Sequence, residues 1–158
     1  VVIVTLPTSS GVKAWAARVI RAPMDKVWPT VRDCQHFHEF MPRTKNSRLV
    51  TQNGTTMICE VEISMPFPLS NLKATTRATN TALPEGQGYE RKWALVRGNY
   101  KRNSGSWEIK PWGEGTTLAV YQIDVDPDMM VPDAILRKAQ TGSLPDLFTV
   151  IEKRAQGR

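Results

Sequence analysis

The chain has 158 residues, a net charge of +6 and 41% hydrophobic residues, which is an ordinary composition for a globular protein. That length suits one domain able to bury a core without disulfides or metals. No apolar run approaches the roughly 20 residues that span a bilayer. We therefore expect a soluble protein, cytoplasmic or periplasmic. Because the chain begins at Val1, it fits either a processed N-terminus or a trimmed chain.

Two cysteines, Cys34 and Cys59, occur far apart in the sequence. Neither belongs to a CxxC pair, which disfavours a zinc site or thioredoxin-type redox chemistry. Cys59 lies among apolar residues and is predicted to be a small core side chain. A disulfide between the two is not expected, because the chain has no cysteine-rich framework.

The N-terminal third predicts one strand followed by two short helices. Residues 1–11 are expected to be an extended N-terminal segment, and Lys13–Ile20 reads as the first strand. Pro23 suits the first turn of a helix, where its missing N–H costs nothing. Pro29 disrupts a long helix, so this helix should be short. A second short helix is predicted over Cys34–Phe40.

Residues 44–126 follow a period of two, which is typical of strands with one buried face. In Met57–Met65 the odd positions are apolar, whereas Glu60 and Glu62 occupy even positions. The further predicted strands are Leu72–Ala82, Tyr89–Arg97, Ser104–Lys110 and Thr116–Val125. Together with the first strand, this pattern predicts an antiparallel sheet of six to seven strands.

A long helix is predicted from Pro132 to about Ala155, with a kink or break at Pro145. Its expected apolar stripe consists of Leu136, Ala139, Ser143, Leu147 and Val150. One long helix alone is available to cover the sheet. A curved sheet around a single helix leaves a gap that suits an apolar pocket. The fold class predicted is therefore α+β.

Three stretches resemble the START family and the wider helix-grip superfamily. They are Ile20–Pro23 with Val27-Trp28 downstream, Pro66–Asn71, and Tyr121–Pro127 followed by Met130–Pro132. The resemblance covers residues 13–155 and is greatest to compact bacterial members, which grade into polyketide cyclases and coenzyme Q-binding proteins. It implies a helix-grip fold, with residues 1–158 forming a single ligand-binding domain. It also implies a hydrophobic tunnel gated by loops and by the final helix. Leu72-Lys73 stands where the family usually carries an Arg-Asp pair.

Large apolar side chains supply the candidate ligand-binding residues. The chain has five Trp and six Met, and Met adapts to varied ligand shapes. The residues predicted to line the pocket are Trp28, Met57, Trp93, Trp107, Tyr121, Met129, Met130, Leu136 and Leu147. Tyr121 adds a hydroxyl that either reads one polar ligand atom or bonds the backbone. The turn Asp126–Val131, together with the start of the closing helix, is the expected gate.

Several polar residues are candidates for a buried ion pair or for metal binding. START relatives can hold a buried acid–base pair, and Arg77 lies near the matching position. The alternation places Glu60 and Arg77 on the outer face, which predicts a surface ion pair. His36 and His38 are two apart, a spacing that does not converge on a metal in a helix. No cofactor, metal or catalytic residue is expected, because no GxSxG, HExxH or P-loop occurs.

Basic residues occur in small groups, including Arg91-Lys92, Arg137-Lys138 and Lys153-Arg154. Such groups form a solvated surface or attract the protein transiently to an anionic membrane. Nucleic-acid binding is not expected, because no RNP, zinc-finger or helix-turn-helix signature accompanies the charge.

The function predicted is binding of a small hydrophobic ligand (lipid, sterol, quinone or polyketide-like) by a non-catalytic carrier or sensor. The alternatives are a small polyketide cyclase or dehydratase on the same fold, and a protein-interaction module without a ligand. Fold does not choose between them, since function resides in the site.

Overall fold

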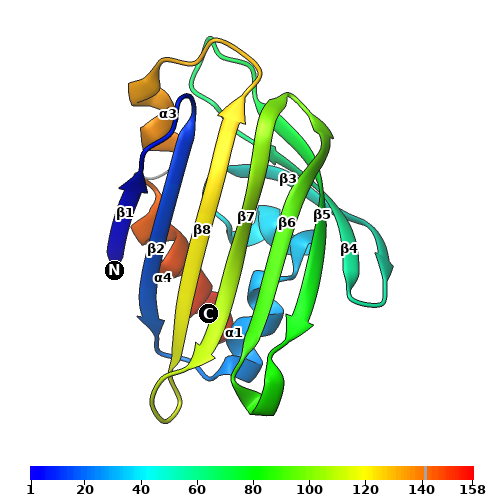
Figure 1. Ribbon diagram of the computed structural model, residues 1–158, viewed down its shortest axis with the longest axis vertical. Helices are drawn as coiled ribbons and strands as arrows, with labels where there is room; N and C mark the ends of the chain where they lie inside the picture. The colour runs from blue at the N-terminus through cyan, green and yellow to red at the C-terminus, as the bar shows by residue number, and fades with distance from the viewer. Residues whose placement is uncertain (141) are drawn as a thin grey trace.

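A computed structural model describes residues 1–140 and 142–158. Within these residues, eight strands form one antiparallel sheet in the order β1-β2-β8-β7-β6-β5-β4-β3 (Figure 1). The strands are β1 Val2–Leu6, β2 Val12–Ile20, β3 Thr44–Asn53, β4 Thr56–Ile63, β5 Leu72–Ala82, β6 Tyr89–Gly98, β7 Tyr100–Pro111 and β8 Thr117–Pro127. The α-helices are α1 Met24–Val31, α2 Phe37–Phe40, α3 Asp133–Gln140 and α4 Leu144–Ala155. Short 3₁₀ turns, η1 and η2, cover Cys34–His36 and Pro84–Gly86.

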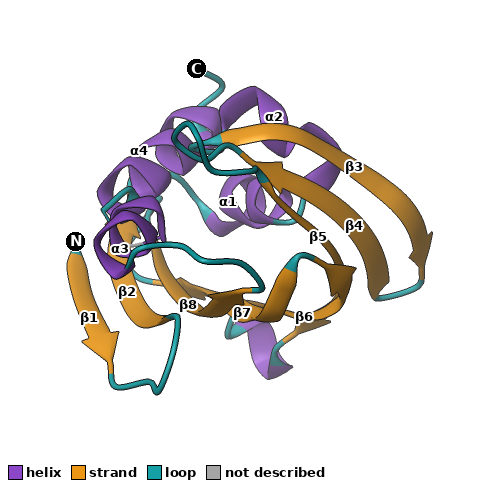
Figure 2. Ribbon diagram, turned by 90° about the horizontal axis from the view of Figure 1, so that it is seen from above, coloured by secondary structure: helices purple, strands orange, loops and turns teal. Residues whose placement is uncertain are grey.

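The sheet curves strongly, and the helices lie on its concave side (Figure 2). Seen from above, β2, β8, β7 and β6 form one wall, while β5, β4 and β3 turn back toward the helices. This arrangement confirms the α+β helix-grip fold, including the two short helical segments after β2. No helix in the described parts of the chain is long and apolar enough to cross a bilayer.

The strand count exceeds the prediction because the N-terminal segment contains an additional edge strand. β1 pairs with β2 from Val2 opposite Ala17 to Leu6 opposite Lys13. Its side chains Val2, Ile3 and Val4 remain exposed. Since β1 has apolar residues at successive positions, it lacks the alternation that identified the other strands.

The closing helix is divided into α3 and α4, and this division corrects the predicted apolar stripe. Pro145 lies in the first turn of α4, where it begins the second helix, so the break precedes it. Because the break resets the helical phase, the buried apolar residues of α4 are Leu144, Phe148, Ile151 and Ala155. Leu147 and Val150 are only half-buried. The side chain of Ala139, also in the predicted stripe, lies outside the described residues.

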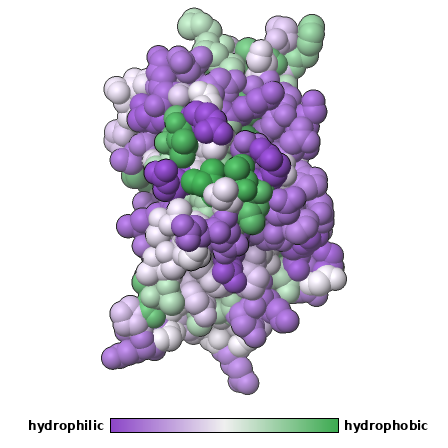
Figure 3. Space-filling view, turned by 90° about the vertical axis from the view of Figure 1, so that its right-hand side faces the viewer, coloured by the Kyte–Doolittle hydropathy of each residue, from purple (hydrophilic) through white to green (hydrophobic). Residues whose placement is uncertain are grey.

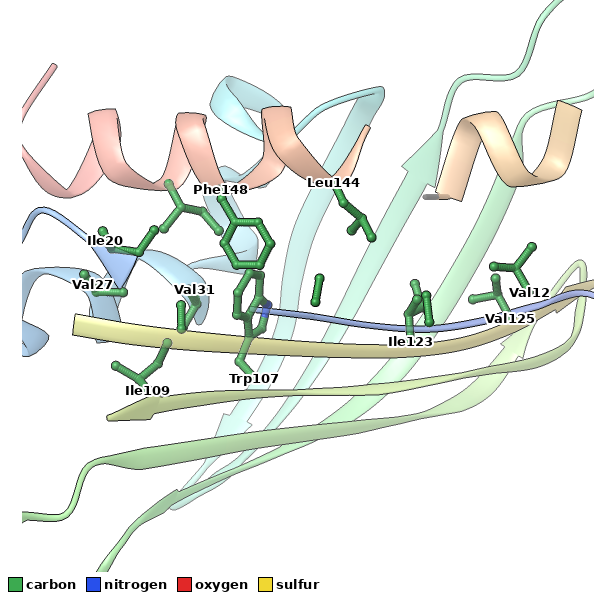
Figure 4. Close-up of a cluster of buried hydrophobic side chains, with 14 of the residues drawn as sticks. Val12, Ile20, Val27, Val31, Trp107, Ile109, Ile123, Val125, Leu144 and Phe148 are labelled. Carbon is green, nitrogen blue, oxygen red and sulfur yellow. The ribbon is translucent and has the colours of Figure 1, made fainter. Parts of the chain in front are cut away.

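The core forms where α4 packs against the sheet. Phe148 points toward Trp107 of β7, with ring centroids 5.8 Å apart in an edge-to-face arrangement (Figure 4). Ile20, Val27 and Val31 are fully buried beside them. At the same end, Glu152 of α4 accepts hydrogen bonds from Arg18 and Arg21. Burial alone raises the pKa of Glu152, but the Arg21 hydrogen bonds and the charges of both arginines outweigh it, so the pKa is lowered.

A disulfide joins Cys34 of η1 to Cys59 of β4, contrary to the sequence expectation. Both cysteines are fully buried. They are 25 positions apart, and they meet because η1 packs across β3 and β4 at the closed end of the curved sheet. A cysteine count alone carries no signal for this proximity. The bond ties the α1–η1–α2 segment to the sheet.

Removing the disulfide should destabilise the protein by about 3 kcal/mol, since the bond closes a loop of intermediate length in the unfolded chain. Urea denaturation with and without reductant measures this difference. The double variant Cys34→Ala/Cys59→Ala should unfold at a lower urea concentration than the oxidised protein and should not respond to reductant. Equal midpoints for oxidised and reduced wild type would contradict the bond.

Candidate ligand cavity

A cavity of about 190 Å³ lies between the concave face of the sheet and α4. Strands β4 to β8 contribute most of its wall, and α1, α2, the α2–β3 turn with the start of β3, and the beginning of α4 with the residue before it contribute the remainder. The cavity exists because Phe148 holds the middle of α4 on the sheet, whereas Leu144 and Leu147 near its beginning face the open space.

Aromatic rings form one continuous side of the cavity. Tyr121 of β8 lies between Trp107 and Trp93, with centroid distances of 4.6 and 6.0 Å. Trp93 lies directly over Gly105, its cross-strand partner on β7. A Cβ atom at position 105 would collide with the Trp93 ring and with the Gln122 carbonyl oxygen. The missing side chain therefore makes room for the indole.

Polar groups on the wall are mainly hydrogen-bond donors. Tyr100 and Tyr121 both line the cavity, and burial raises the pKa of each phenol, so both remain protonated at neutral pH. Thr76 adds a hydroxyl. Asn103 accepts the Trp93 indole N–H at 3.2 Å through its Oδ1, which leaves the amide NH₂ as a donor.

Arg91 of β6 is the charged group on the inner wall. Its side chain donates to Asn80 Oδ1 at 3.2 Å and lies against the sulfur atoms of Met57 and Cys59. The residue is 4% exposed. Burial, followed by the nearby Arg32 charge, lowers the pKa of Arg91 to about 10, so the guanidinium is still charged at neutral pH.

The cavity opens between the α2–β3 turn and the beginning of α4. Arg43 is exposed, and Met41, Ser143 and Leu147 are half-buried although all of them line the cavity. Figure 3 looks at the β3 and β4 side and shows an island of hydrophobic atoms surrounded by hydrophilic side chains. These exposed and half-buried residues form the rim of the cavity. The turn Asp126–Val131, which was the expected gate, does not contribute to this rim.

Four of the nine predicted residues lie on the cavity wall: Trp93, Trp107, Tyr121 and Leu147. Trp28 is buried elsewhere and stacks on Tyr89 at 4.8 Å. Met57 packs behind the wall, where Asn80 donates to its sulfur at 3.0 Å.

The other three predicted residues come from the β8–α3 connection and α3. Met129 and Leu136 line a separate cleft beside the β1–β2 loop. Met130 is 93% exposed. Leu136 is buried, as the helical stripe predicted, but against this other cleft, and Met129 and Met130 lie in a turn that has no period to assign them to a face.

The structure places two polar residues, Arg91 and Tyr100, on the cavity wall, where the sequence analysis did not predict them. Arg91, grouped with Lys92 as a surface basic pair, is buried because it shares the inward face of β6 with Tyr89 and Trp93. The alternation along β6 therefore identifies Arg91 as an inward-facing cation, which the sequence prediction missed. Tyr100 was missed because it begins its strand.

Glu60 is a surface residue, as the alternation predicted. It forms ion pairs with Arg48 at 2.9 Å and with Arg97 at 4.0 Å, and Arg77 is exposed on the same outer face. The two histidines have local partners, because His36 bonds Asp33 and His38 bonds Ser47.

The curved sheet, the closing helix α4 and the cavity between them define a START-like, helix-grip fold. Residues 20–149 match the family described as polyketide cyclase/dehydrase and lipid transport, and the chain belongs to that family. A STAR-related lipid transfer protein from Xanthomonas axonopodis is similar in structure, with a TM-score of 0.81 and 18% identity over 98% of this chain and 92% of that chain. The aromatase/cyclase ZhuI from Streptomyces sp. R1128 is also similar, with a TM-score of 0.75 and 12% identity over 92% and 97% of the two chains.

A START superfamily protein from Mycobacterium smegmatis shares the fold as well, with a TM-score of 0.70 and 15% identity over 92% of this chain and 97% of that chain. In sequence, PA1579, an uncharacterised protein of Pseudomonas aeruginosa, is 26% identical over 127 residues. This match covers 68% of the present chain and 59% of PA1579, so the chain spans about three-fifths of that relative.

Gly105→Ala should disturb the aromatic wall, because the added methyl group displaces Trp93. Overpacking of this kind typically costs about 1–3 kcal/mol. Urea denaturation measures the loss, and a shift of tryptophan emission reports the displaced ring. Ser106→Ala, the next residue on β7, is the control and should leave the emission spectrum unchanged. Wild-type stability and emission in Gly105→Ala would contradict the contact.

Proposed function

We propose that this protein binds a small, largely apolar ligand in the cavity, as a carrier or sensor. The observation that carries the proposal is the wall itself, which combines a continuous aromatic side with a few donors facing one enclosed space. The family's inclusion of lipid transport supports this function.

The cavity volume bounds the ligand. An apolar cavity of about 150 Å³ is enough to bind benzene, so 190 Å³ suits a ligand of one or two rings or a short chain. Burying about 200 Å² of apolar surface contributes about 5 kcal/mol at 25 cal/mol per Å². That free energy corresponds to a Kd on the order of 0.1–1 mM. Tighter binding requires polar contacts with the wall.

The cyclase or dehydratase alternative requires a general base near the substrate. Among the described residues that line the cavity there is no carboxylate or imidazole. Tyr100 and Tyr121 have raised pKa values and therefore serve as donors rather than bases at neutral pH. The lack of a carboxylate or imidazole on the described wall favours binding over proton abstraction.

We also propose that the ligand is exchanged at an anionic membrane surface. Phe67, in the β4–β5 loop, is 97% exposed, and Met130, in the β8–α3 loop, is 93% exposed. The two loops lie at the upper end of the molecule in Figure 1. Asn99 connects the two loops through two hydrogen bonds. Its side-chain NH₂ donates to the backbone carbonyl oxygen of Asn71, and its backbone carbonyl oxygen accepts from the N–H of Asp128. Exposed apolar side chains on adjacent loops of a cationic protein suit insertion between lipid headgroups.

Tyr121→Phe should change ligand preference more than stability, because it removes one donor from the wall and leaves the ring packing. Tryptophan quenching can measure 1:1 binding of 2-naphthaldehyde, which carries a carbonyl, and of 2-methylnaphthalene, which does not. The variant should lose about 3- to 10-fold in affinity for the aldehyde alone, the worth of one neutral hydrogen bond. Tyr89→Phe, outside the cavity, is the matched control. Unchanged selectivity in Tyr121→Phe makes this residue purely structural.

The double variant Phe67→Ser/Met130→Ser should bind vesicles at least several-fold more weakly than wild type, because two apolar side chains no longer enter the headgroup layer. Co-sedimentation with vesicles of 30% anionic lipid measures the effect. Trp112→Ser, which removes another exposed apolar side chain, is the control. Equal binding by all three proteins would place the membrane contact elsewhere.

A further inference from the structure

Arg91 is a buried charge that lacks an anionic partner. Its guanidinium contacts one amide oxygen and two sulfur atoms, and sulfur is a weak acceptor. No carboxylate among the described residues lies within ion-pair distance of its guanidinium, and the other charge acting on it is that of Arg32. Buried charges in proteins are ordinarily paired.

An unpaired buried guanidinium is costly for the folded protein, because the charge loses its hydration. A methionine or leucine at this place would extend the apolar surface formed by Met57, Ala78 and the Cys34–Cys59 bond. The arginine therefore lowers the stability of the fold relative to an apolar residue. A bound ligand that supplies the missing counter-charge would explain why an arginine is buried at this position.

The position of Arg91 fits this role. It lines the cavity between its cross-strand neighbours Asn80 and Trp107. Its Nη2 lies 3.6 Å from the sulfur of Cys59, whereas Ile63, four residues along β4, lines the cavity near the rim. Four residues of strand span about 13 Å. Arg91 thus occupies the inner part of the cavity, level in the sheet register with Trp107 and Tyr121, and Trp93 is the next inward residue of β6 toward the rim.

The charges of the wall agree with an anionic ligand. The described lining residues include two arginines, Arg91 within and Arg43 at the rim, and no acidic residue. Thr76 and Asn103 supply neutral donors on the wall. An anion entering this space therefore meets two cations and no carboxylate among the described lining residues, and guanidinium matches a carboxylate with two parallel hydrogen bonds.

We propose that the ligand is a monocarboxylate with a small apolar body, bound with its carboxylate on Arg91 and its apolar part along Trp93, Tyr121 and Trp107. This inference rests on the proposed function and adds the chemical class of the ligand. One carboxylate neutralises the one inner cation, and a body of one or two rings fits the volume of about 190 Å³.

The test compares two ligands of the same shape, 2-naphthoate and the neutral 2-naphthalenemethanol, by isothermal titration calorimetry at pH 7. Wild type should bind the carboxylate at least tenfold more tightly, the expected gain from a charge-assisted hydrogen bond. Arg91→Met should lose that preference, bind the alcohol as wild type does, and melt at the same or a higher temperature. Arg77→Met removes an exposed arginine on β5 and should keep the preference, which controls for net charge.

Equal affinity of wild type for the two ligands would overturn the carboxylate inference while leaving the apolar carrier intact. A failure of both ligands, and of neutral two-ring analogues, would overturn the proposed function together with it. A preference that survives in Arg91→Met would assign the anion to another cation and overturn the role of Arg91. The wild-type comparison needs no variant, so it decides the carboxylate preference even if Arg91→Met does not fold.

Discussion

The structure depends on where α4 contacts the sheet. One curved sheet has to be covered by one substantial helix, and the edge-to-face contact of Phe148 with Trp107 determines how close the two layers come. Glu152 strengthens the same end, because Arg18 and the backbone and side chain of Arg21 all bond its carboxylate. Toward the beginning of α4 the layers diverge, and the space left between them is the cavity.

The break between α3 and α4 determines which residues of α4 pack into the core and which lie at the rim of the cavity. If one helix continued from Asp133 to Ala155, the phase of its apolar face would place Leu147 and Val150 on the sheet. Instead α4 begins anew at Leu144, packs Phe148 and Ile151 into the core, and leaves Leu147 at the rim. Neighbouring residues of α4 therefore pack into the core and line the opening of the cavity.

Sequence periodicity predicted most of the sheet and one side of the cavity. The inward positions of β6, β7 and β8 follow from alternation, which is why Trp93, Trp107 and Tyr121 were assigned to the wall. Helical periodicity was less informative, because it assumes an unbroken phase, and the buried residues of α4 are consequently Phe148 and Ile151 rather than Leu147 and Val150. Met129 and Leu136 lie in another cleft because the β8–α3 connection and α3 pack beside the β1–β2 loop. The Cys34–Cys59 bond depends on tertiary proximity and has no local signal.

Arg91 shows how composition can obscure a pattern. Arg91 is two residues from both Tyr89 and Trp93, and this spacing predicts an inward position on β6. However, Arg91 and the adjacent Lys92 together look like an ordinary basic surface pair. Charge is the stronger predictor of exposure in general, since arginine is rarely fully buried. An arginine on an apolar face is therefore informative when periodicity and charge disagree, because only a specific partner makes such burial favourable.

The open cavity and the disulfide act on different parts of the stability of the protein. Side chains that face the cavity lack part of the packing that a filled core supplies, and small domains are stable by only about 5–15 kcal/mol. The Cys34–Cys59 bond adds about 3 kcal/mol by restricting the unfolded chain. In general, a ligand that binds only the folded state adds about 2.7 kcal/mol at 100 times its Kd. The bond therefore stabilises the fold independently of any ligand, whereas a ligand would add an amount set by its concentration and its Kd.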